Sequence, residues 1–327
     1  MTLSNRDNTL ATIYFEKADY VPMTSEAFSM TGIGVSSVTD CPLSDGKDMF
    51  GVPWKVTHEG AMPEPGFVMF DDIEDWEKFT HVPDLDSIDV KALARADMER
   101  RPPDRENKLV QIMRPTGIFQ RLVAMMGFEN ALIALVSEPE SCMDYFDVVS
   151  DYMVRYNDAV IDAYGPDVYI YSDDISTANS TFMSVETYKE VIAPFHARIA
   201  EGIRKHEGVV AEYHECGLSE PIIPLLADMG FQMWHSANPH NDLNAMMDGP
   251  LKGRMCVEGG WDPHCAASYL GAPVELLEEE TRRCMNAYKR PGFIFLPFVL
   301  NERGNSMVVG DERMPNVKAV WEELRDF

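Results

Sequence analysis

Basic residues are scarce in this chain of 327 residues. Lys and Arg total 28 against 54 Asp and Glu, which leaves a formal net charge of −26 at neutral pH. A protein that binds nucleic acid neutralises phosphates with clustered Lys and Arg, so this balance disfavours that class of function. We therefore expect no nucleic-acid partner.

Long hydrophobic runs are also missing. No window approaches the roughly 18 consecutive apolar residues that a membrane-spanning helix needs, and the first residues, MTLSNRDN, do not form a basic-then-apolar signal peptide. Six cysteines in a chain of this length are too few for a disulfide scaffold. These features predict a cytoplasmic protein with reduced thiols and no membrane association.

Neither a Gly-x-Gly-x-x-Gly cradle nor a Gly-x-x-x-x-Gly-Lys loop occurs, which disfavours a doubly wound dinucleotide-binding sheet. The chain is nevertheless 45% hydrophobic and alternates short β-rich runs with helical ones, a pattern typical of parallel α/β folds. The expected strands are 21–23, 108–114, 167–173, 209–214, 231–235, 253–258 and 292–297.

No linker or repeat divides the chain. We therefore predict one domain over 1–327, a single (β/α)8 TIM barrel whose eighth strand is not recognised. Residues 1–105 include an N-terminal helical and loop elaboration, with an irregular stretch over 29–85 that is rich in Gly, Pro and Asp.

One expected strand carries polar residues on a single face. In 209–216, alternation directs His214 and Cys216 the same way, at the carboxyl end where barrel enzymes build their sites. Imidazole and thiolate are good zinc ligands, and their Cα atoms lie about 6 to 7 Å apart on a strand face. A structural role is the alternative, because one His-x-Cys pair is a weak motif.

The strand over 253–258 shows the same pattern. Arg254, Cys256 and Glu258 alternate on one face, and layers in a barrel interior draw on alternate strands. Glu258 is therefore predicted as a third metal ligand, with Cys256 as the alternative, and Glu258 is also a candidate acid.

Other polar residues follow neighbouring strands. Asp173 and Asp174 are candidates for proton transfer or metal binding, with capping of a loop as the alternative. The residues expected to contact a substrate are Arg114, Thr116, Asn179 and Trp234. Arg114 has the alternative role of tying down a loop.

Several segments resemble the uroporphyrinogen decarboxylase superfamily, in particular its cobamide-dependent methyltransferase branch. The similar segments are Asp48-Met-Phe-Gly-Val-Pro-Trp54, Tyr171-Ser-Asp-Asp174, His214-Glu-Cys-Gly217, Gly259-Gly260-Trp-Asp262 and Gly292-Phe-Ile-Phe-Leu-Pro297. The resemblance implies that His214 and Cys216 carry zinc and that a partner protein supplies a corrinoid.

Two departures refine this expectation. Val299 stands where the branch that acts on coenzyme M is expected to have a zinc-ligand Cys. Either the third ligand comes from elsewhere, with Glu258, Cys256 and Asp174 as candidates, or zinc is not held here. The Arg-Gln-Ala-Gly-Arg segment of true decarboxylases has no counterpart near Met23.

The sequence thus favours a zinc-dependent methyltransferase. It would move a methyl group between a small methyl donor, such as an O-methyl aryl ether, and the cobalt of a corrinoid protein. The alternatives are a metal-independent carboxy-lyase that uses Asp173 or Asp174 with Arg114, and a corrinoid- or tetrapyrrole-binding module without catalysis.

Overall fold

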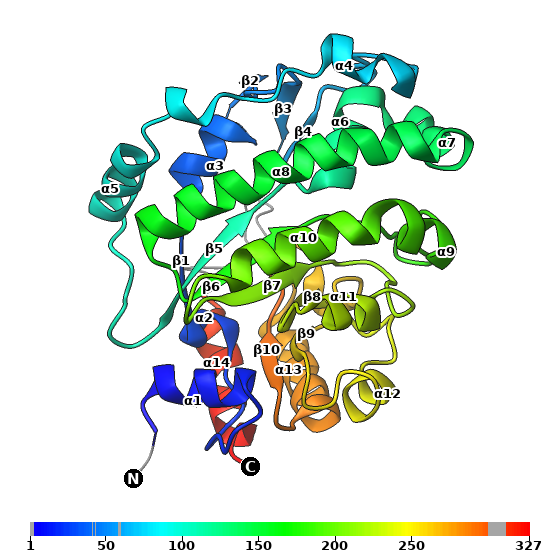
Figure 1. The fold of residues 1–327 in the computed structure, drawn as a ribbon. Helices are drawn as coiled ribbons and strands as arrows, with labels where there is room; N and C mark the ends of the chain where they lie inside the picture. The colour runs from blue at the N-terminus through cyan, green and yellow to red at the C-terminus, as the bar shows by residue number, and fades with distance from the viewer. Residues whose placement is uncertain (1–2, 41, 43, 58–59, 300–311) are drawn as a thin grey trace.

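A curled sheet of seven parallel strands forms the centre of the molecule (Figure 1). The computed structural model describes residues 3–40, 42, 44–57, 60–299 and 312–327. The strand order is β1-β5-β6-β7-β8-β9-β10. Their bounds are β1 Phe28–Thr31, β5 Leu109–Arg114, β6 Val168–Ser172, β7 Val210–His214, β8 Met233–Ala237, β9 Cys256–Gly260 and β10 Phe293–Leu296.

The first strand differs from the sequence prediction. β1 lies in the stretch expected to be irregular, whereas 21–23 contributes only an isolated parallel bridge between Met23 and Phe295. The backbone N–H of Phe295 donates to Pro22 O at 2.8 Å, so this segment lies against the β10 edge of the sheet. In the part of the chain that the structure describes, the sheet is a seven-stranded half-barrel, and the expected eighth strand is not formed.

The strand expected at 253–258 begins later, at Cys256. Gly253 has a left-handed φ of 67°, and the N–H of Arg254 donates to Leu251 O at 2.9 Å, so a turn occupies these positions. Arg254 therefore lies outside the strand, where it pairs with Asp228 on the surface. The prediction that Arg254 shares a strand face with Cys256 and Glu258 is wrong.

Helices separate successive strands, as the alternating pattern predicts. They are α1 Asn5–Ile13, α2 Thr24–Ala27, α3 Ile33–Thr39, α4 Trp76–Phe79, α5 Val90–Arg100, α6 Ile118–Met126, α7 Phe128–Ser137, α8 Pro139–Tyr164, α9 Val185–Thr187, α10 Ala193–Arg204, α11 Ile223–Met229, α12 Leu243–Asp248, α13 Val274–Tyr288 and α14 Met314–Leu324. Short 3-10 turns lie at Ile73–Asp75, Leu85–Ser87 and Ala266–Ser268, and a π-helical turn at Tyr188–Ile192.

The long helix α8 shows why this sequence folds as a helical layer on the sheet. Its buried side chains recur every three or four residues, which places them on one face, and many of them are aromatic. Figure 1 shows α8 and α10 side by side over β5, β6 and β7. The buried residues of α8 are Cys142, Tyr145, Phe146, Val149, Ser150, Tyr152, Met153, Tyr156, Asn157, Val160, Ile161 and Tyr164.

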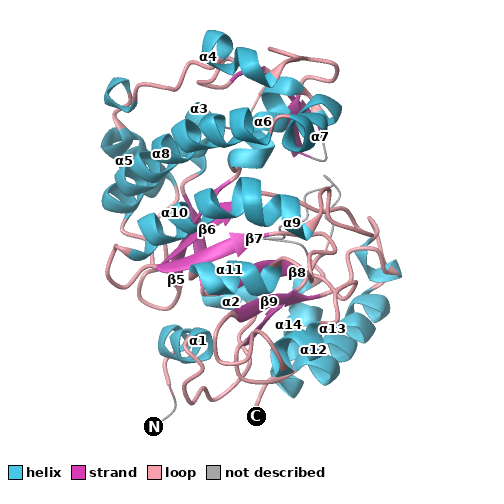
Figure 2. Ribbon diagram, turned by 45° about the vertical axis from the view of Figure 1, so that its right-hand side comes forward, coloured by secondary structure: helices cyan, strands magenta, loops and turns pink. Residues whose placement is uncertain are grey.

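A small antiparallel sheet lies between β1 and β5 in the chain and is formed by β2 Gly46–Lys47, β3 Pro53–Thr57 and β4 Gly60–Pro63. Asp48 anchors it, because its carboxylate accepts the Trp54 indole N–H at 2.9 Å and pairs with the buried Arg121 of α6. Both ends of the chain lie at the opposite end of the molecule (Figure 2), where the N–H of Val21 donates to Arg325 O at 3.0 Å.

Within the described residues, no single helix is long and apolar enough to cross a membrane. The pair α6 and α7 passes that test together on length and composition, with a bend of 115° between them.

Candidate metal centre

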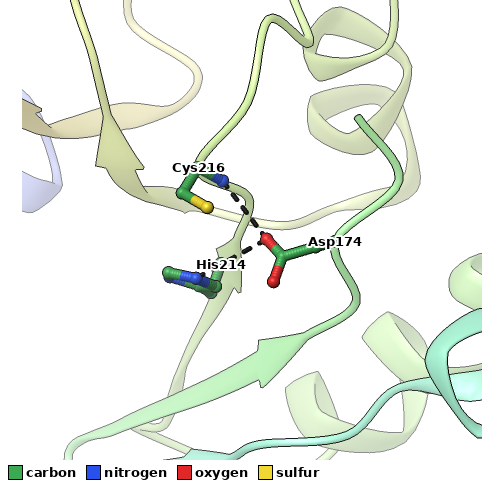
Figure 3. A group of neighbouring side chains, drawn as sticks. All are labelled: Asp174, His214 and Cys216. Atoms are coloured by element: carbon green, nitrogen blue, oxygen red, sulfur yellow. Dashed lines mark hydrogen bonds and ion pairs between the residues drawn. The ribbon is translucent and has the colours of Figure 1, made fainter. Parts of the chain in front are cut away.

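Three potential metal ligands converge where β6 and β7 end (Figure 3). They are Asp174, His214 and Cys216, and their ligand atoms all lie within 4.8 Å of one another. The structure therefore brings His214 and Cys216 together, and it adds the carboxylate of Asp174. Glu258 and Cys256 do not belong to this group.

Register of the parallel strands explains the convergence. Ser172 of β6 is level with His214 of β7, so Asp174 follows its strand end just as Cys216 follows the neighbouring one. The N–H of Cys216 donates to Asp174 Oδ1 at 3.3 Å, which links the two loops directly. Asn238, after β8, donates its side-chain N–H to Cys216 O at 2.5 Å.

His214 is oriented by a second imidazole that the sequence analysis did not select. Its Nδ1 lies 2.6 Å from Nδ1 of His235, and its Nε2 lies 3.6 Å from Asp174 Oδ1. Burial and the neighbouring His214 hold the pKa of His235 well below its usual value, so His235 is neutral. When the Nδ1–H of His214 donates to His235, the Nε2 lone pair is left to bind a metal. The available sequence signal was the position of His235 at the end of the next expected strand.

The Cys216 thiol is next to negative charge. Cys216 is exposed as a residue, but loss of water around its thiol, followed by the carboxylates of Asp174 and Glu215, raises the pKa of that thiol. Such a thiol stays protonated unless a cation compensates the charge of the thiolate, and a bound metal ion does this. This electrostatic environment fits a cation held among the three groups.

Glu215 is a second residue that sequence reasoning missed. It lies between His214 and Cys216 in the chain and is completely buried. Its carboxylate accepts the N–H of Ile175 at 2.7 Å, that of Gly217 at 3.1 Å, and the hydroxyl of Ser176. Burial and the charge of Asp174 raise the pKa of Glu215 to about 8. Glu215 thus joins the two loops that carry the metal group, from the opposite face to His214 and Cys216.

Asp173 lies apart from the group although it is adjacent to Asp174. It is fully buried, and its carboxylate accepts the backbone N–H groups of Phe119 and Gln120 at 2.9 and 2.8 Å. His196 Nε2 lies 2.9 Å from the same carboxylate. These contacts cap the N-terminus of α6, which is a different segment from the following loop that the sequence analysis proposed for capping.

Glu258 lies inside the sheet, beside a second buried carboxyl group. Glu258 Oε1 accepts the hydroxyl of Thr24 at 2.5 Å, and Gln111 Nε2 donates to Glu212 Oε2 at 2.8 Å. Burial raises the pKa of Glu258, and burial together with the charge of Glu258 raises that of Glu212. Both groups therefore favour the protonated form more than a free glutamate does. Cys256 is buried in the apolar cluster formed by the first residues of the strands.

None of the four residues expected to bind substrate is one of the three potential metal ligands. Arg114 is buried, pairs with Asp40 at 2.9 Å and lies 4.3 Å from the ring centroid of Tyr156. Burial alone would lower its pKa, but the Asp40 carboxylate raises it. These contacts hold the segments around Arg114 and Asp40 together, and the substrate role of Arg114 stays a prediction.

The other three have separate surroundings. The carbonyl of Thr116, also a buried residue, accepts Arg114 Nε at 3.3 Å. Trp234 is fully buried and its indole N–H donates to Glu215 O at 2.9 Å. Asn179 lies exposed in the loop after β6.

The donor set of the metal group matches zinc. One imidazole nitrogen, one sulfur and one carboxylate oxygen are the three ligand types that zinc takes, and three protein ligands leave an open position for a substrate. The fold and this group together define the class of protein. It is an α/β half-barrel with potential metal ligands at the carboxyl ends of its strands.

The chain belongs to the uroporphyrinogen decarboxylase (URO-D) family, whose pattern matches residues 56–297. This finding confirms the family expected from the sequence.

One sequence relative and one structural neighbour are methyltransferases. The chain is 26% identical over 186 residues to a methylated-thiol--coenzyme M methyltransferase of Methanosarcina mazei. That match spans 48% of this chain and 48% of the relative, so the chain covers about half the length of this curated protein. A solved methyltransferase structure from Methanosarcina mazei superposes with a TM-score of 0.64 at 14% identity, covering 98% of this chain and 99% of that one. The superposition shows that the fold of this chain is similar to that of a TIM-barrel-like methyltransferase.

Proposed function

We propose that this protein is a zinc-dependent methyltransferase that moves a methyl group between a small methyl donor and the cobalt of a corrinoid protein. The convergence of Asp174, His214 and Cys216 at the carboxyl ends of β6 and β7 is the observation that carries the proposal. The methyltransferase relatives support the reaction class.

In this proposal His214 Nε2, Cys216 Sγ and an Asp174 oxygen hold the metal. Zinc, when bound, supplies Lewis acidity toward the heteroatom that carries or receives the methyl group. His235 orients the imidazole of His214, and Gln120 holds the second Asp174 oxygen with a 3.1 Å hydrogen bond. These contacts keep the ligands in place before a substrate arrives.

The chemical types of the three proposed ligands also indicate which class of methyl donor the protein uses. Val299 is buried and offers no ligand atom where the coenzyme M branch is expected to have a Cys, and Asp174 lies with His214 and Cys216 instead. A carboxylate is a harder ligand than a thiolate and donates less electron density to the metal. This favours an oxygen leaving group, so we propose an O-methyl compound such as an aryl ether as donor, with methylated thiols as the competing class.

The partner in this proposal is a corrinoid protein that presents its cobalt above the rim. The support is the resemblance to cobamide-dependent methyltransferases together with the position of the metal group at the strand ends, where barrel enzymes build their sites. The chain acts as one domain over 1–327, with the small-molecule donor binding beside Asp174.

A carboxy-lyase is the competing function, because the family is named for a decarboxylase. Its proposed acids are Asp173 and Asp174, and its proposed cation is Arg114. Asp174 lies in the metal group, and the other two residues are engaged within the protein. Asp173 caps α6, and Arg114 is paired with Asp40. The contacts of these two residues therefore favour methyl transfer.

The test combines metal analysis with a methyl-transfer assay on the full chain. Purified protein is loaded with zinc and offered aryl methyl ethers, methyl thioethers or methylamines, with cob(I)alamin as acceptor, and methylation of cobalt is followed by absorbance. Cys216→Ala and His214→Ala should each remove zinc from this group and abolish turnover, whereas Cys265→Ala, a partly exposed cysteine outside the group, should retain both. A zinc-free protein with full activity would overturn the proposal.

A further inference from the structure

A second set of metal-ligating side chains lies beyond the ends of β8 and β9. His240 follows β8, and Asp262 and His264 follow β9. Their ligand atoms lie within 4.8 Å of one another, and none of the three belongs to the group around Cys216. We propose that these residues form a second binding site, for a divalent first-row transition metal such as zinc.

The geometry requires little movement to bind an ion. His240 Nε2 lies 3.8 Å and His264 Nδ1 lies 3.9 Å from the same oxygen, Asp262 Oδ1. Two ligands at about 2.0 to 2.2 Å from a zinc ion can stand at most roughly 4.4 Å apart. The imidazole rings of His240 and His264 stack, with centroids 4.9 Å apart and an interplanar angle of 15°.

The backbone of this site is already held. The N–H of Asp262 donates to Glu280 Oε1 at 2.9 Å, and its carbonyl accepts the hydroxyl of Ser268 at 2.7 Å. Asp262 Oδ1 also accepts the N–H of His264 at 2.8 Å, which points the carboxylate toward the imidazoles. Only the two rings need to turn, and they can, because the side chains of His240 and His264 are 31% and 60% exposed.

One side chain links the two groups. Asn238 Oδ1 accepts the N–H of His240 at 3.0 Å, while its Nδ2 donates to Cys216 O. The second site therefore lies on the same rim as the first, and an ion there would cross-link the loops after β8 and β9. This inference rests on His240, Asp262 and His264 alone and does not depend on the proposed methyl transfer.

The ligand types distinguish the two sites. Two imidazoles and one carboxylate with open coordination positions suit zinc, iron(II), cobalt(II) or nickel(II), and no thiolate takes part. Exposure leaves the remaining positions to water, so this site should bind its metal less tightly than the group around Cys216.

The experiment is a cobalt(II) titration of the metal-free full chain, with bound metal measured after equilibrium dialysis. A thiolate-to-cobalt absorption band reports the Cys216 group only, and total bound metal reports both sites. The wild type should bind two equivalents. His240→Asn and His264→Asn should each weaken the second equivalent by more than tenfold and leave the thiolate band unchanged. His81→Asn, which alters an exposed histidine outside both groups, is the matched control.

The outcomes separate this inference from the proposed function. Cys216→Ala should abolish the thiolate band and keep the equivalent at His240 and His264. A protein that binds one equivalent without a thiolate band, and loses it in His264→Asn, would support the second site while contradicting the first. Wild-type binding of a single equivalent that shows the thiolate band, or unchanged binding by both histidine variants, would overturn the second site.

Discussion

The Nδ1 atoms of His214 and His235 lie 2.6 Å apart, so one of the two rings must donate a proton to the other. Because the pKa of buried His235 is held well below its usual value, His235 is the neutral partner that fixes His214. This relationship makes His235 a positioning residue for the proposed metal ligand.

Loss of this contact should weaken metal binding without removing a ligand. We expect His235→Phe to lower zinc affinity by about 10- to 100-fold, the usual effect of removing the partner of a metal-bound histidine. His235→Asn, which keeps an acceptor near Nδ1, should lose less. Competition with a chelator measures the affinity, and equal affinity in wild type and His235→Phe would contradict the assigned role.

Asp173 and Asp174 should respond differently to the same substitution. Asp173→Asn weakens the cap of α6 and the contact with His196, so it should lower the free energy of unfolding by roughly 2–3 kcal/mol. Asp174→Asn should leave stability within about 0.5 kcal/mol, because the residue is partly exposed, yet it should reduce zinc affinity. Denaturant unfolding and metal analysis are measured on both variants. If Asp173→Asn instead reduced zinc affinity and Asp174→Asn lowered stability, the roles assigned to the two residues would be exchanged.

Gly117 is required by the close approach of α6 to Asp173. A Cβ at Gly117 would lie 2.3 Å from Asp173 Cβ, and Asp173 is itself held by buried hydrogen bonds. Gly117→Ala should therefore destabilise the protein by about 1–3 kcal/mol, the range for overpacked positions. Gly46→Ala is the control, since its nearest neighbour is 3.7 Å away. Equal unfolding midpoints for the two variants would refute this packing argument.

Arg114 should matter for stability more than for substrate affinity. Arg114→Met leaves the buried Asp40 with Arg121 as its remaining cation, and breaking a buried pair in this way costs about 3–5 kcal/mol. Arg155→Met, which removes an exposed pair with Asp151 on α8, should cost about 0.5 kcal/mol or less. Thermal unfolding distinguishes the two variants. A raised KM with unchanged stability in Arg114→Met would restore the substrate-binding prediction.

The carboxyl group of Glu258 should give stability a pH dependence. Its pKa is raised in the folded state, so the protonated form is favoured by folding. Its contribution is fully present below the ordinary glutamate pKa and is lost as pH rises through the folded-state value.

Glu258→Gln removes this dependence. The stability difference between variant and wild type should shift in favour of the variant as pH rises, by up to about 1.4 kcal/mol per pH unit across that interval. Glu279→Gln, an exposed glutamate, is the control and should follow the wild type. Parallel stability curves for Glu258→Gln and wild type would contradict a raised pKa at this position.

Local patterns predicted much of the fold. Strands β5 to β8 and β10 lie within two residues of their expected bounds at every end, because alternating apolar runs and flanking turn residues are local signals. β1 was not recognised, since four residues, Phe28–Thr31, beside Gly and Ser carry no periodicity that separates a strand from a loop. β9 begins later than predicted because Gly253, which has a left-handed backbone conformation, belongs to a turn and does not start the strand.

For the metal group, alternation along one strand was sufficient to pair His214 with Cys216, because both lie on the same short segment of backbone. Glu258 follows the same rule on its own strand but lies beside Glu212 in the interior. Strand periodicity predicts which face of the sheet a side chain lies on. Its level along the strand direction relative to residues of other strands depends on the register between strands that are distant in sequence.

The sequence by itself determined the family, the βα alternation and the His-x-Cys pair, since each of these is written in contiguous residues. Only the tertiary structure decided that Asp174 rather than Asp173 or Glu258 joins that pair. Asp173 is drawn inward because the helix N-terminus of α6 offers it two N–H groups at close range across Gly117. Its neighbour is thereby left facing His214 and Cys216, and that choice depends on packing between segments more than fifty residues apart in the chain.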